Sequence, residues 1–211
     1  MTSIRYVLIG DGPSDAVLVD VINWSLEQVG FVGDGDFLHA KQQPPKIDLR
    51  SRIAHALAEF PQSRIAFVHR DAERAAFTTR YKEIERALPA SEARARPCVA
   101  IVPVRMTEAW LLTSEKAIRG AAGNPNGRVP LSLPKTSRLE ALPNPKNTLL
   151  SLLREAKSSK PRLRRKFDAE RARYQVPRYT PTFRALRALG SFSRFEEDLR
   201  AAIQQVVGEH T

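Results

Sequence analysis

Short apolar runs alternate with amphipathic stretches over the first 112 residues of the chain. Apolar runs predict buried strands at residues 5–9, 64–71 and 98–104, and a brief further strand is predicted within 33–40. Between them, apolar residues recur at helical spacing, as Val17, Leu18, Val21 and Ile22 do. This spacing predicts helices over residues 14–28, 47–60 and 77–89, and a further helical stretch over 107–120.

Strands that alternate with helices are typical of an α/β fold with a mainly parallel sheet flanked by helices. In such folds the ligands lie beyond the carboxyl ends of the strands, where the connecting loops converge. The chemistry is therefore expected near Asp11, near Asp71 and near Thr107 and Glu108, which follow three of the predicted strands.

The rest of the chain has a different pattern and divides the sequence into three parts. Residues 120–145 hold five prolines and three glycines, which predicts a connector between a core over 1–119 and a third part over 146–211. The apolar spacing in that third part predicts helices alone.

The charge of the chain supports this division. The net charge is +11, and residues 111–211 carry all of it, with 20 Lys and Arg against 9 Asp and Glu. Such an excess favours a polyanionic partner, most often nucleic acid. The predicted contacts are the cations of 160–173, namely Lys160, Arg162, Arg164, Arg165, Lys166, Arg171 and Arg173. A solvated basic helix, or a dock for an acidic protein, is the alternative.

Composition excludes several classes of protein. No apolar run approaches the roughly 18 residues that a membrane span needs, so no membrane partner is expected. The single cysteine, Cys98, has no partner for an internal disulfide and no companions for a zinc site. A cytoplasmic protein is the simplest expectation.

The turn after the first strand, Gly10-Asp11-Gly12-Pro13-Ser14-Asp15, allows three interpretations. It resembles a dinucleotide-binding loop, but its third glycine is replaced by Asp15, and Asp11 places negative charge where a phosphate would lie. The two carboxylates can instead favour the first turn of the following helix. A third interpretation is a metal site, because a second acidic pair ends the strand at 64–71.

That second pair is Asp71 and Glu73. Residues i and i+2 of an extended strand point to the same side, so both carboxylates are expected to face one point in the crevice. Adjacent carboxylates repel each other unless a cation lies between them, and Mg²⁺ prefers oxygen ligands. Of the four histidines, only His69 stands near these acids in the sequence.

These residues resemble the Toprim signature of topoisomerases, bacterial primases and OLD-type nucleases. Asp11-Gly12-Pro13-Ser14-Asp15 is similar to its first motif, with Asp for the usual Glu. Asp71-Ala72-Glu73 is similar to its second motif, with Glu for the final Asp. The stretches TEAWLL at 107–112 and NPK at 144–146 look like an uncharacterised Toprim-like family that is often encoded beside ATPases in phage-defence loci.

The resemblance, which spans roughly residues 4–155, implies a Toprim fold and a metal-dependent nuclease that hydrolyses DNA or RNA. It implies one or two Mg²⁺ or Mn²⁺ ions held by Asp11, Asp15, Asp71 and Glu73. The catalytic candidates are Asp11, Asp71, Glu108 and Lys146. An ATPase partner in phage defence is implied as well, and a homo-oligomer is left open. The alternative is a catalytically inactive Toprim-like module that binds nucleic acid or a partner.

Overall fold

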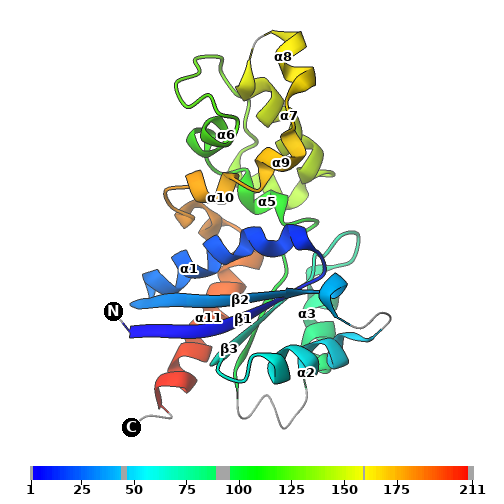
Figure 1. The fold of residues 1–211 in the computed structure, drawn as a ribbon, viewed down its shortest axis with the longest axis vertical. Helices are drawn as coiled ribbons and strands as arrows, with labels where there is room; N and C mark the ends of the chain where they lie inside the picture. Colours follow the sequence, from blue (N-terminus) through cyan, green and yellow to red (C-terminus); the bar gives the residue numbers. More distant parts are fainter. Residues whose placement is uncertain (1, 44–46, 89–95, 159, 209–211) are drawn as a thin grey trace.

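The computed structural model describes residues 2–43, 47–88, 96–158 and 160–208. Within them, four strands form one parallel sheet in the order β2-β1-β3-β4 (Figure 1). The strands are β1 (Thr2–Gly10), β2 (Phe31–His39), β3 (Ile65–His69) and β4 (Cys98–Ile101). The predicted α/β class with a parallel sheet is confirmed.

Helices connect the strands and continue the chain beyond them. The α-helices are α1 (Leu18–Gln28), α2 (Leu49–Glu59), α3 (Phe77–Ala87), α5 (Glu108–Leu111), α6 (Glu115–Ala121), α7 (Pro145–Lys157), α8 (Pro161–Lys166), α9 (Ala169–Arg173), α10 (Val176–Tyr179) and α11 (Gly190–Gly208). Short 3-10 turns are η1 (Pro13–Val17), η2 (Ala40–Gln42), η3 (Thr136–Ala141) and η4 (Arg184–Ala188).

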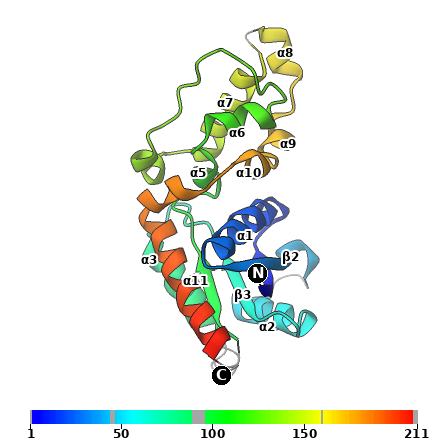
Figure 2. The same cartoon turned by 90° about the vertical axis from the view of Figure 1, so that its left-hand side faces the viewer.

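Alternate residues of the central strands β1 and β3 point to opposite sides, and helices cover both faces of the sheet there. Tyr6, Leu8 and Phe67 pack in the larger cluster with α1 and α11, whereas Val7 and Val68 pack with α2 and α3. Figure 2 shows α11 lying along the sheet. The final helix of the chain is therefore part of the sheet's own core.

The helices from α5 to α10 form a lobe that lies beyond α1, away from the strands (Figures 1 and 2). The predicted connector, residues 120–145, contains the end of α6 and all of η3. Trp110 at the base of this lobe is fully buried, and its ring meets Phe192 of α11 edge to face at 5.1 Å. The division into three parts stays a prediction, and α11 packs the end of the third part against the core.

Strand β2 is longer than the brief strand expected from the sequence, because it pairs with β1 over nine residues. Gly35 lies opposite Tyr6, and a Cβ atom at Gly35 would stand 2.2 Å from the Tyr6 ring. The tyrosine hydroxyl donates to Asn23 Oδ1 at 2.8 Å. The glycine is thus needed where an aromatic side chain crosses the neighbouring strand.

Strand β3 is shorter than expected, and this difference changes the site. It ends at His69, so Asp71 and Glu73 lie in the following loop rather than on a strand. Glu73 has a φ of 53°, in the left-handed region, and this backbone turn separates the two side chains. The expectation that Asp71 and Glu73 point to the same side is wrong.

Candidate active site

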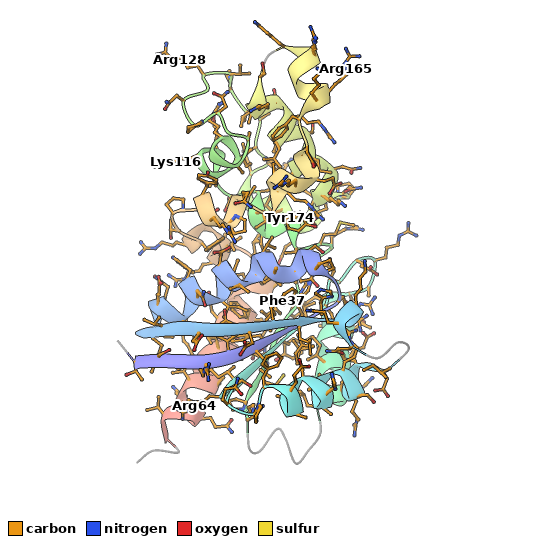
Figure 3. The ribbon with its side chains drawn as sticks, viewed as in Figure 1. Phe37, Arg64, Lys116, Arg128, Arg165 and Tyr174 are labelled. Atoms are coloured by element: carbon orange, nitrogen blue, oxygen red, sulfur yellow. The ribbon has the colours of Figure 1, made fainter. Side chains whose placement is uncertain are left out.

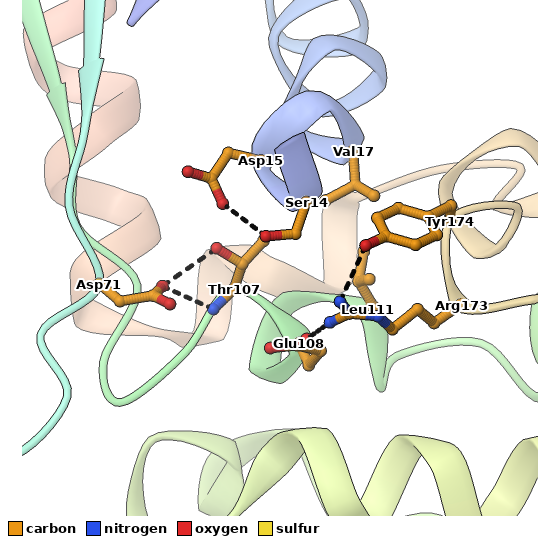
Figure 4. Close-up of a pocket in the computed structure, with 9 residues that line it drawn as sticks. All are labelled: Ser14, Asp15, Val17, Asp71, Thr107, Glu108, Leu111, Arg173 and Tyr174. Carbon is orange, nitrogen blue, oxygen red and sulfur yellow. Dashed lines mark hydrogen bonds and ion pairs between the residues drawn. The ribbon is translucent and has the colours of Figure 1, made fainter. Parts of the chain in front are cut away.

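A cavity of about 50 Å³ lies at the carboxyl edge of the sheet, where the loops after β1, β3 and β4 meet the helical lobe (Figure 4). This is the edge at which an α/β sheet is expected to bind its ligands. The lining residues are Ser14, Asp15, Val17, Asp71, Thr107, Glu108, Leu111, Arg173 and Tyr174. Three carboxylates thus share one small cavity.

Asp71 is held in this cavity by Thr107. Its Oδ1 atom accepts hydrogen bonds from the Thr107 amide at 2.8 Å and from the Thr107 hydroxyl at 3.0 Å. Burial, and to a smaller extent the nearby carboxylates of Asp15 and Glu108, raise the pKa of Asp71 from 3.8 to about 6, against the opposing effects of His69 and Thr107. The ionised form of Asp71 is therefore disfavoured in the folded protein.

His69 lies beneath these acids with only 1% of its surface exposed. Its Nδ1 atom is 3.1 Å from the Ile101 carbonyl, which only accepts, so Nδ1 carries a proton. Its Nε2 atom lies 3.2 Å from Thr107 Oγ1, 3.5 Å from Asp71 Oδ1 and 3.7 Å from Asp15 Oδ1. The sequence indicated His69 only by its nearness to Asp71. The signal that could have placed it in the site is that it is the last residue of an apolar strand.

Asp15 closes the turn that precedes it. Its Oδ2 atom accepts from the backbone amides of Asp11 at 2.8 Å and Gly12 at 3.0 Å, and its Oδ1 atom accepts from the Ser14 hydroxyl at 3.2 Å. Asp15 therefore caps the first turn of the following helix, as the second interpretation of this segment predicted. Only its Oδ1 edge faces His69 and the cavity.

Asp11 does not line this cavity, and two arginines bind its carboxylate. Arg52 Nη1 is 2.9 Å from Oδ1, and Arg70 Nε is 2.9 Å from Oδ2. Arg52 also donates to the Gly10 carbonyl at 2.7 Å, which fixes the guanidinium over the turn. Asp11 is therefore paired with arginines and does not line the cavity that holds Asp71.

Glu73 is also directed elsewhere. Its side chain is 65% exposed and lies 3.4 Å from Arg80 Nη2. The predicted role of Asp11 and Glu73 as metal ligands stays a prediction, and their contacts with arginines do not support it.

Glu108, one of the catalytic candidates, is buried and paired with Arg173. Thr107 does not cap the helix that Glu108 begins, because its hydroxyl bonds Asp71 instead. Arg173 donates to the Tyr174 hydroxyl at 3.0 Å and lies over that ring. The guanidinium of Arg173 forms part of the cavity wall, and its predicted contact with nucleic acid stays a prediction.

A chain of alternating charges connects this pair to the surface. Arg173 Nε lies 3.1 Å from Glu170 Oε2, and Lys146 Nζ lies 3.3 Å from Glu170 Oε1. Lys146 stands in the first turn of α7, which begins after the Asn144 cap. As a catalytic residue, Lys146 stays a prediction, since its described partner is an acid outside the cavity.

The donor chemistry at the cavity fits a divalent cation, because Asp71, Glu108 and Asp15 offer carboxylate oxygens. Within the described ranges, no three acidic, histidine or cysteine side chains stand together as a ready metal site. Mg²⁺ commonly takes one or two carboxylates and completes its shell with water and substrate phosphates. Two carboxylates of this cavity would therefore match the usual protein share of a magnesium site, and the metal itself stays a prediction.

The other predicted nucleic-acid contacts lie in the helical lobe. Arg162, Arg165 and Lys166 are exposed on α8 at helical spacing, and Lys160 and Arg171 are exposed as well. Arg165 lies at the end of the lobe farthest from the sheet (Figure 3). The side chain of Arg164 lies outside the described part of the structure. The exposed cations are thus available to solvent.

Comparison with protein-family models, with curated proteins and with solved structures found no match. The Toprim resemblance therefore stays a prediction that rests on the motifs. No helix in the described ranges is both long and apolar enough to cross a membrane.

Proposed function

We propose that this chain is a metal-dependent nuclease of the Toprim type, which hydrolyses phosphodiester bonds of DNA or RNA. The observation that carries the proposal is the cavity in which Asp15, Asp71 and Glu108 converge at the carboxyl edge of a parallel sheet. The raised pKa of Asp71 supports it, since perturbed carboxylates in a cleft are typical of functional sites. The resemblance adds an ATPase partner and a role in phage defence.

Each side chain has a role in this proposal. Asp71 and Glu108 hold a divalent cation, and Thr107 fixes the orientation of Asp71 through two hydrogen bonds to one oxygen. A bound Mg²⁺ or Mn²⁺ supplies positive charge that stabilises the oxygens of the reacting phosphodiester. His69 Nε2 faces Thr107 and two carboxylates and forms the floor of the cavity.

A second candidate function is a catalytically inactive module that binds nucleic acid or a partner. The observation in its favour is the double ion pair of Asp11 with Arg52 and Arg70, because both carboxylate oxygens are occupied by guanidinium groups. Asp11 stands where the Toprim motif has its first acid. An Asp11 that stays bound to arginines leaves such a site without that acid.

One experiment separates the two functions. Purified protein is incubated with end-labelled DNA or RNA and Mn²⁺, and cleavage and binding are measured on the same samples. We expect cleavage by the wild type and none by Asp71→Asn, with binding retained. Asp34→Asn is the matched control, because Asp34 is an exposed carboxylate on β2 that pairs with Arg5.

The outcomes have distinct meanings. Cleavage by Asp71→Asn at the wild-type rate contradicts the catalytic assignment. Binding without cleavage by the wild type, with Mg²⁺ as well as Mn²⁺, favours the inactive module.

A further inference from the structure

A larger groove lies beside the acidic cavity, and no part of the site described above uses it. It encloses about 440 Å³ between the loop after β3, the loop after β4 and the start of α7. Its lining residues are Glu73, Arg74, Ala75, Arg80, Arg105, Met106, Pro143 and Asn144. We call it the arginine groove.

The lining of the arginine groove is strongly basic. Three of its residues are arginines, and Glu73 is its one acid within the described ranges. Arg80 is engaged by Glu83 at 2.9 Å and by Glu73 at 3.4 Å. Arg74 and Arg105 form no ion pair with any described residue, so two guanidinium groups of this groove remain available to an anion.

The backbone of the two loops is tied together at the groove. Glu73 and Arg105, with φ of 53° and 67°, are the two non-glycine residues of positive φ in the described part of the chain. The Glu73 amide donates to the Arg105 carbonyl at 2.8 Å, and the Ala72 amide donates to the Pro103 carbonyl at 3.1 Å. These bonds fix where the loops place Arg74 and Arg105.

The same two loops also form the acidic cavity. One contributes Asp71 to the cavity and Arg74 to the groove, and the other contributes Thr107 to the cavity and Arg105 to the groove. The hydrogen bond between the Thr107 amide and Asp71 joins the loops at the boundary. A ligand that fills the groove therefore lies next to the carboxylates.

We propose that the arginine groove binds the phosphodiester backbone of a nucleic acid, and that Arg74 and Arg105 contact its phosphates. The planar guanidinium fork binds phosphate through two parallel hydrogen bonds, which suits such a contact. The amino terminus of α7, whose cap Asn144 lines the groove, adds a positive dipole end on the same side. This inference rests on the proposed function, because it places the backbone beside the cavity that cleaves it.

Binding is measured by fluorescence anisotropy with a labelled oligonucleotide in buffer with EDTA, so that cleavage does not affect the result. The test variant is Arg74→Gln/Arg105→Asn, because asparagine tolerates the left-handed backbone at position 105. The control is Arg5→Gln/Lys116→Gln, which removes the same charge at two exposed positions outside the groove. Melting temperatures confirm that both proteins fold.

We expect the test variant to bind about tenfold more weakly than the control, with the slope of log K against log salt lowered by about 1 to 2. Arg74→Gln alone, at an exposed position, gives a smaller loss in the same direction and keeps the test valid if the double variant unfolds. Test and control variants of equal affinity overturn the proposal.

Two further results separate this inference from the proposed function. A mononucleotide or inorganic phosphate is added as a competitor at the same phosphate concentration as an unlabelled oligonucleotide. If it competes as well as the oligonucleotide does, the groove recognises a free phosphate, and the assignment to a nucleic-acid backbone is overturned. Loss of binding in the test variant with no cleavage by the wild type supports the groove and rejects the nuclease. Cleavage by the wild type with unchanged binding in the test variant rejects the groove alone.

Discussion

Because the Asp71 carboxylate is buried near two other carboxylates, we expect Asp71→Asn to stabilise the protein at neutral pH. Asparagine keeps a carbonyl oxygen that accepts both hydrogen bonds from Thr107, and it removes the charge that burial and the neighbouring acids disfavour. The substitution therefore relieves an electrostatic penalty without removing the local contacts.

The magnitude follows from the pKa. A rise from 3.8 to about 6 corresponds to about 3 kcal/mol of differential stability between the two protonation states. Because the Asp71 side chain is 30% exposed, water screens part of this penalty, and we expect about 1–2 kcal/mol. For a chain of this size that is a rise in Tm of about 2–8 °C.

The pH dependence has a definite sign. The folded protein keeps the Asp71 proton to a higher pH than the unfolded chain, so it binds more protons between about pH 4 and pH 6. The contribution of Asp71 to stability is therefore lost as the pH rises through its folded pKa. The gain from Asp71→Asn is expected to be small at pH 4 and complete at pH 7.

The assay is thermal and urea unfolding of the wild type and Asp71→Asn across this pH range, in buffer with EDTA. Asp34→Asn serves as the control, because it makes the same change in charge at an exposed carboxylate. A difference between wild type and Asp71→Asn that does not vary with pH, or a destabilised variant at pH 7, refutes the reasoning about crowded carboxylates.

Four further predictions test the packing and the charges. Mn²⁺ at a hundred times its Kd raises the unfolding free energy of the wild type by about 2.7 kcal/mol, which is measured as a higher Tm, and it leaves the Tm of Asp71→Asn unchanged. Arg173→Met costs about 3–5 kcal/mol in urea unfolding because Glu108 is left buried without its partner, and Glu108→Gln/Arg173→Met restores most of it. Gly35→Ala lowers the free energy of unfolding by about 1–3 kcal/mol in urea unfolding, because the alanine Cβ overlaps the Tyr6 ring. Replacing the exposed cations of α8 with glutamine lowers the salt slope of nucleic-acid binding by about 1 for each phosphate that the variant no longer neutralises. These cations are Arg162, Arg165 and Lys166. An unchanged salt slope shows that they do not contact the nucleic acid.

The sheet was predictable because its signal is local. Apolar runs such as 5–9 and 64–71 predict strands wherever they lie, and the alternation with helices predicts parallel pairing. The length of β2 was not predictable in this way, because Gly33, Asp34, Gly35 and Asp36 all have low strand propensity. Pairing with β1 and the space needed by Tyr6 decide that segment, and both depend on residues about 30 positions away.

The place of the site was predictable for a topological reason. Parallel strands end at the same edge, so the residues after β1, β3 and β4 meet there, and Asp15, Asp71 and Glu108 do line one cavity. The partner of each charge was not predictable. Asp11 pairs with an arginine 41 positions later, and Glu108 with one 65 positions later.

These pairings predict which carboxylate would respond to a cation. Asp11 is neutralised by Arg52 and Arg70, and Glu108 by Arg173, so each already has a fixed positive partner. Asp71 has no arginine or lysine at ion-pair distance among the described residues, and its pKa is raised first by burial and then by the carboxylates of Asp15 and Glu108. A divalent cation gains most where such a charge is unbalanced, because its binding removes the penalty that raised the pKa. The choice between a nuclease and an inactive binding module therefore depends on Asp71 more than on the Asp that replaces the first acid of the motif.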